Sequence, residues 1–143
     1  MVEVLIAVLI VGVLAAIAIP AYDRYQDRID RSKAITDIRV LQLLISDHIA
    51  NSGAPPASLA DVGNGGMLDP WGSAYVYVDV TGPGGKGKAR KDHKFNPINS
   101  EFDLYSKGKD GDSKSQLTQK SSLDDIVRAR DGAFVGLAED FSP

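Results

Sequence analysis

The sequence predicts an α+β fold in which a long N-terminal helix packs on a small antiparallel β-sheet that has a long C-terminal loop region. Three observations predict this fold. Only one of the first 22 residues is charged, the next 29 contain neither Gly nor Pro, and two strand-like segments follow a Gly- and Pro-containing loop. A chain of 143 residues has room for one compact domain, and the absence of cysteine excludes disulfides and thiolate metal sites.

Residues 1–22 are predicted to form the transmembrane or filament-core half of the helix. Val4 to Ile19 is a run of 16 apolar residues, and with its flanks the segment reaches about 20 residues, enough to cross a bilayer. A cleavable secretory signal and a buried core helix are the alternatives. No basic residue precedes the run and Glu3 stands at its start, which argues against a signal peptide. The rest of the chain is too polar to enclose the run as a core helix.

Glu3, Gly12 and Pro20 are the candidate assembly residues of this segment. A carboxylate at the edge of a bilayer-length helix is costly unless it is solvated at the interface or paired with a charge from another chain. Glycine weakens a helix interior, and proline removes one helical hydrogen bond. The stretch between Gly12 and Pro20 is therefore expected to bend or to melt locally, the latter only where other protein covers the backbone.

Residues 23–52 are predicted to be the amphipathic half of the helix, and residues 53–143 a C-terminal globular domain. An apolar stripe at helical spacing supports the first prediction: Ala34, Ile38, Leu41, Ile45 and Ile49. In the globular domain, residues 74–81 and 101–105 combine β-branched and aromatic side chains and are predicted to be antiparallel strands. Residues 123–141, with scattered apolar side chains, are assigned to no strand.

Two sets of residues resemble a known family. Residues 3–20 (EVLIAVLIVGVLAAIAIP) are similar to the N-terminal helix of type IV pilins and pseudopilins. Residues 69–72 (DPWG) and 103–111 (DLYSKGKDG), with residues 124–126 (DDI), resemble the major pseudopilin of type II secretion. The family's glutamate is usually fifth, after a methylated phenylalanine, whereas here it is third, so the mature N-terminal residue and its methylation stay open.

The resemblance implies a structural subunit of a helical filament, most like the type II secretion major pseudopilin. Before assembly, such a subunit is a single-pass protein of the bacterial inner membrane with its C-terminal domain in the periplasm. Its partners in assembly are an assembly platform and minor pseudopilins. Glu3 would pair with a neighbour's N-terminal amine. The major subunit of a surface type IV pilus is the alternative, and a membrane-tethered periplasmic binding domain is a more remote one. No nucleophile–base pair, phosphate loop or histidine cluster indicates an enzyme.

The resemblance also implies a structural calcium ion. Asp110, Asp124 and Asp125 would supply carboxylates, and Lys107 and Ser122 backbone carbonyls, toward the six to eight oxygens that calcium takes. Asp110 and Asp124 are 14 residues apart, a longer spacing than in the family's calcium loop. The alternative is that these acids are solvated turn residues, some of them paired with neighbouring lysines.

One cluster of basic residues lies between positions 86 and 94 and is predicted to form a solvated hairpin tip: Lys86, Lys88, Arg90, Lys91 and Lys94. With a net charge of −3, the chain has no overall basic field, and nucleic acid is not expected as a partner. Trp71 is expected to be a packing anchor with its indole N–H bonded locally, and His48 a packed residue at the edge of the helical stripe.

Overall fold

The computed structural model describes residues 1–142. Helix α1 (Val2–Ser52) comes first, followed by β1 (Val76–Asp79), the one-turn helix α2 (Gly85–Lys88), β2 (Phe102–Ser106), β3 (Ile126–Ala129) and β4 (Phe134–Leu137). Short 3-10 helices lie in the connections: η1 (Leu59–Val62), η2 (Lys120–Ser122), η3 (Arg130–Gly132) and η4 (Ala138–Asp140). The chain divides into two compact units between Ser32 and Lys33, and each is described by itself.

The first unit is the N-terminal part of α1. The helix runs without a break through Gly12 and Pro20, although Pro20 cannot donate its helical hydrogen bond. In the single subunit, therefore, the helix is not melted between Gly12 and Pro20. A stretch of α1 near the N-terminus is long and apolar enough to cross a membrane by length and composition, as the sequence predicts.

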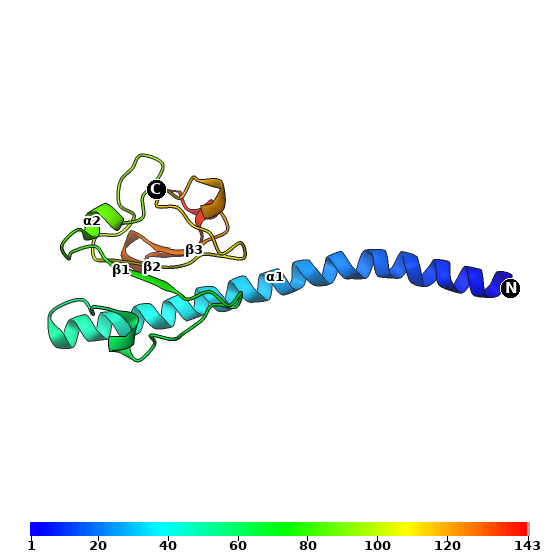
Figure 1. Ribbon diagram of the computed structural model, residues 1–143, viewed down its shortest axis with the longest axis horizontal. Helices are drawn as coiled ribbons and strands as arrows, with labels where there is room; N and C mark the ends of the chain where they lie inside the picture. Colours follow the sequence, from blue (N-terminus) through cyan, green and yellow to red (C-terminus); the bar gives the residue numbers. More distant parts are fainter. Residues whose placement is uncertain (143) are drawn as a thin grey trace. The chain divides into compact units, whose positions relative to one another are not determined.

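The second unit is built on a four-stranded antiparallel sheet in the order β1-β2-β3-β4. β1 and β2 fall within or beside the predicted strand segments, with Val76 opposite Tyr105 and Asp79 opposite Phe102. Figure 1 shows β1, β2 and β3 beside the cyan part of α1. The predicted α+β fold, with a long helix packed on an antiparallel sheet, is confirmed.

Strands β3 and β4 lie within residues 123–141, to which no strand was assigned from the sequence. All four residues of β3 are buried, because Ile126 faces the core against α1 while Val127 and Ala129 belong to a second apolar cluster. A short strand buried on both faces lacks the alternation of apolar and polar residues that identifies a strand in a sequence. The tight turn to β4 places Arg130, Asp131 and Gly132 at positive φ, and the Asp131-Gly132 dipeptide was the turn signal available in the sequence.

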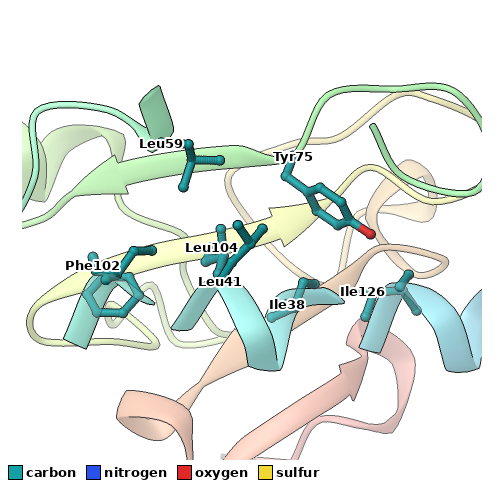
Figure 2. Close-up of a cluster of buried hydrophobic side chains, with 9 residues drawn as sticks. Ile38, Leu41, Leu59, Tyr75, Phe102, Leu104 and Ile126 are labelled. Carbon is teal, nitrogen blue, oxygen red and sulfur yellow. The ribbon is translucent and has the colours of Figure 1, made fainter. Parts of the chain in front are cut away.

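The main core lies between the sheet and the second half of α1. Four stripe residues are fully buried, and Ile49 packs at the edge of the same cluster, so the predicted amphipathic helix is confirmed: Ala34, Ile38, Leu41 and Ile45. Figure 2 shows Leu41 beside Leu104 of β2, with Phe102 and Leu59 in the same cluster. Burying one such aliphatic side chain contributes about 1.5–3 kcal/mol, so this stripe fixes the sheet on the helix.

Two side chains were expected to pack in or beside this core. Trp71 does pack against the main cluster, but its buried indole Nε1 has no hydrogen-bond partner among residues 1–142, so the expected local bond is absent there. His48 is half-buried on α1, at the edge of the stripe as expected, and it lines an open pocket beside η1.

Candidate functional site

The first 22 residues of α1 carry an almost continuous exposed apolar surface. Every residue from Met1 to Tyr22 is exposed except Ala15, which is half-exposed. The side chains of Leu5 and Leu9, for example, are 69% and 66% exposed. Soluble monomers seldom expose so many apolar side chains in one contiguous patch. This surface must be covered by lipid or by other protein, and it is the candidate assembly site.

Glu3 lies in the first turn of α1, where its negative charge is favoured by the positive end of the helix dipole. With Val4, Ala7, Val8 and Val11 it borders an apolar groove along the helix. No ion pair or hydrogen bond of its side chain is found among residues 1–142. A partner for this carboxylate in an apolar environment would therefore come from another molecule.

Gly12 has open space around it, since a Cβ added there would meet no atom within 4 Å. Nothing packed within this chain therefore requires glycine at position 12. Close approach of another helix is the ordinary reason for a small residue on an exposed apolar helix. The assembly roles of Glu3, Gly12 and Pro20 concern contacts between subunits. The structure contains a single chain, so these roles stay predictions.

The predicted calcium ligands lie between β2 and β3, and among them Asp125 is the acid whose carboxylate is buried. Its side chain is fully buried, and its Oδ2 accepts hydrogen bonds from Arg90 Nη2 at 2.5 Å and from Ser113 Oγ at 2.6 Å. Arg90 also donates to Ser113 Oγ, and its guanidinium lies 4.2 Å from the centre of the Tyr105 ring. Asp125 is therefore half of a buried ion pair.

Burial raises the pKa of Asp125 to about 6. Arg90 and Ser113 act in the opposite direction, because both stabilise the ionised carboxylate. Asp124, the adjacent acid, adds a small repulsion that raises the pKa further. Desolvation is the largest of these effects, and the carboxylate consequently depends on Arg90 to stay charged inside the domain.

Asp124 faces the backbone of the β2–β3 loop. Its Oδ2 accepts from the backbone N–H groups of Lys109 at 2.9 Å and Asp110 at 3.2 Å. Gly108 sits under it with φ of +67°, and a Cβ there would approach the Asp124 carbonyl oxygen to 2.4 Å. Glycine is therefore required at position 108, and Asp124 organises the turn that follows it.

The remaining predicted ligands are placed as follows. Asp110 Oδ1 accepts from the N–H of Asp112 at 2.8 Å. Ser122 is buried; its hydroxyl contacts the backbone N–H and carbonyl of Lys114, and its own carbonyl accepts from the N–H of Asp125 at 3.4 Å. Lys107 is half-buried at the end of β2. The structure brings Asp110 beside Asp124 but turns the carboxylate of Asp125 to Arg90.

Within residues 1–142, no group of three or more His, Asp or Glu side chains is placed to hold a metal ion. The three predicted carboxylates are thus not grouped as a metal site among the described residues, and the calcium ion, with the carbonyls of Lys107 and Ser122, stays a prediction from the resemblance. The sequence reasoning missed Arg90, which was grouped with the solvated basic residues but is only 2% exposed. Its residue type was the available signal: it is the one arginine among lysines, and arginine is preferred in buried ion pairs.

Comparison with known proteins shows similarity to fimbrial proteins. The type IV major fimbrial protein FimA of Dichelobacter nodosus is 27% identical over 135 residues, which are 94% of this chain and 82% of FimA. A fimbrial protein of Neisseria meningitidis is 26% identical over 136 residues, which are 92% of this chain and 78% of that protein. The chain is related to the type IV pilins. A fimbrial protein of Pseudomonas aeruginosa is 31% identical over 86 residues, which are 54% of this pilin-like chain and 56% of that protein.

No protein-family profile matches this pilin-like chain, and no solved structure does. The relationship to fimbrial proteins agrees with the fold and with the exposed apolar half of α1. The chain is a pilin-like filament subunit, a structural protein and not an enzyme, as expected. The relatives named above are fimbrial proteins rather than secretion pseudopilins, so they favour the alternative over the leading expectation from the sequence.

Proposed function

We propose that this chain is the main subunit of a surface type IV pilus. The observation that carries the proposal is the exposed apolar surface of residues 1–22 on a chain whose relatives are type IV fimbrial proteins. Before assembly, this half of α1 would lie in the bacterial inner membrane with the globular domain in the periplasm. In the filament, the same surface would pack against the α1 helices of neighbouring subunits.

The apolar surface holds the helix in the membrane before assembly and in the filament core afterwards. Lipid already keeps this surface from water, so close packing between helices would drive their association, while the roughly 25 cal/mol lost for each Å² of apolar surface exposed to water would keep the assembled helices buried. Contacts between different surfaces of identical subunits do not close into a ring unless the rotation fits, and otherwise build a helical filament. Glu3 would then pair with the N-terminal amine of a neighbour, which sets the axial register between subunits.

The type II secretion pseudopilus is the second candidate, favoured by the resemblance of residues 69–72 and 103–111 to the major pseudopilin. In that case the assembly platform and minor pseudopilins would be the partners, and the filament would stay in the periplasm. The predicted calcium ion is not part of either proposal, because the carboxylate of Asp125 already has the Arg90 guanidinium as its cation.

Labelling of intact cells separates the two candidates. Cells that express the full chain in its native genetic background are incubated with an antibody against the globular domain and imaged by electron microscopy. We expect decorated filaments outside the outer membrane. Filaments that are labelled only after the outer membrane is permeabilised would support the secretion pseudopilus, and the absence of filaments in both preparations would contradict both.

A further inference from the structure

An open pocket lies where the last turns of α1 meet η1. It has a volume of about 510 Å³ and is lined by Leu44, Asp47, His48, Asn51, Ser52, Asp61 and Val62. Leu44 and Val62 make it apolar, while the carboxylates of Asp47 and Asp61 make it acidic. The last turn of α1 contains no basic residue, so the negative end of the helix dipole adds to the same potential. The pocket therefore favours a ligand with an apolar tip and positive charge beside it.

The turn formed by residues 92–96 presents that combination on another part of the globular domain. Phe95 is 67% exposed and has φ of +64°, a conformation that residues with a Cβ rarely adopt. Asp92 holds the turn, because its Oδ1 accepts from the N–H groups of Lys94 at 2.7 Å and Asn96 at 2.8 Å. His93 and Lys94, the two residues before Phe95, are exposed as well. An aromatic ring next to the charged Lys94 is thus held out in solvent by an ordered turn.

We propose that the 92–96 turn of one subunit docks into the α1–η1 pocket of another copy of this chain. Phe95 would contact Leu44 and Val62, and Lys94 would face Asp47 and Asp61. The exposure of Phe95 means that the turn does not fill the pocket of its own chain. With a volume of about 510 Å³, this open pocket has room for one aromatic side chain at the surface.

The opposite charges of turn and pocket select a second copy as the occupant. The contact joins two different surfaces of identical chains, which makes it heterologous and compatible with a growing filament. The inference rests on the proposed filament function, and it adds to the apolar contact between helices a charged contact between globular domains. Exposed charge pairs weaken as ionic strength rises, so this contact should be salt-sensitive.

Thiol cross-linking in filaments of the full chain tests the contact, since the native sequence contains no cysteine. The variant His93→Cys/Asn51→Cys places one thiol beside Phe95 and one in the pocket while leaving Phe95, Lys94 and Asp47 unchanged. The matched control is His93→Cys/Ala50→Cys, because Ala50 is exposed next to Asn51 but does not line the pocket. Filaments are treated with a short bis-maleimide and separated on a denaturing gel.

We expect a ladder of covalent multimers from the Asn51 pair, at least about fivefold stronger than from the Ala50 pair. Filaments that form but give no ladder, or equal ladders from both pairs, would overturn the docking while leaving the filament function intact. Failure of the unmodified full chain to form filaments would overturn both.

A charge exchange gives a second readout that needs no cysteine. Lys94→Asp should lower the filament yield at physiological salt, and Lys94→Asp combined with Asp47→Lys should restore it, because the ion pair is rebuilt in reverse. Restoration supports the docking. A combined variant with a yield no higher than that of Lys94→Asp alone would overturn the pairing of these two residues.

Discussion

Arg90 Nη2 lies 2.5 Å from Asp125 Oδ2, and both side chains are almost completely buried. The pair joins the segment after α2 to the residue just before β3, and Ser113 from the intervening loop donates to the same carboxylate oxygen. One internal guanidinium thus ties together three parts of the chain, two of which also meet in an isolated parallel β-bridge between Lys91 and Gln116.

Removal of Arg90 should be strongly destabilising. Arg90→Met leaves the buried Asp125 without its cation, and breaking one side of a buried pair costs about 3–5 kcal/mol. Chemical denaturation of the full chain in detergent, followed by tryptophan fluorescence of Trp71, measures the loss. Lys88→Met is the control, since Lys88 is exposed, and it should stay within about 0.5 kcal/mol of the wild type. A loss below about 1 kcal/mol for Arg90→Met would show that the pair does not hold the domain together.

Calcium should change the stability little, because Arg90 already supplies the positive charge at Asp125. Melting curves of the full chain in detergent, recorded with millimolar calcium and with a chelator, should have the same midpoint. An ion that binds only the folded chain would raise the midpoint by mass action. A clear upward shift with calcium, lost in Asp110→Ala, would establish the calcium site that the family resemblance implies.

Asp125 should give the stability a pH dependence of unusual sign for a carboxylate. Its pKa is about 6 in the folded chain, above the usual value of about 3.9 for an unfolded chain. Between these values the folded state binds more protons, so this group's contribution to stability falls as pH rises from about 4 to about 6. Asp125→Asn should remove that component, which the difference between the two pH profiles measures. Parallel profiles would contradict the raised pKa.

Two neighbouring leucines of α1 should respond very differently to truncation. Leu41 is fully buried against the sheet, so Leu41→Ala should cost about 2–5 kcal/mol through lost burial and the cavity left behind. Leu43 is 69% exposed, and Leu43→Ala should be nearly neutral for folding of the single chain. Equal losses in denaturation would mean that the second half of α1 packs in a different rotation.

The sequence was sufficient for the parts of the fold that follow a simple period. The stripe of Ala34, Ile38, Leu41 and Ile45 has helical spacing, and each of these side chains is buried. β3 could not be predicted in this way, because Val127 and Ala129 are buried on the face opposite Ile126. The burial of Asp125 depends on its pairing with Arg90, which is 35 residues away in the sequence. No local sequence pattern predicts a pairing over such a separation.

Filament formation by the full chain tests the central claim most directly. The wild-type chain, extracted from membranes and freed of detergent, should sediment as filaments visible by electron microscopy, with residues 1–22 in the filament core. Glu3→Ala should keep the monomer folded and membrane-inserted but lower the filament yield several-fold, because the carboxylate has no partner in its own chain among residues 1–142. A wild-type chain that stays monomeric in every such preparation, or Glu3→Ala filaments at wild-type yield, would contradict the account.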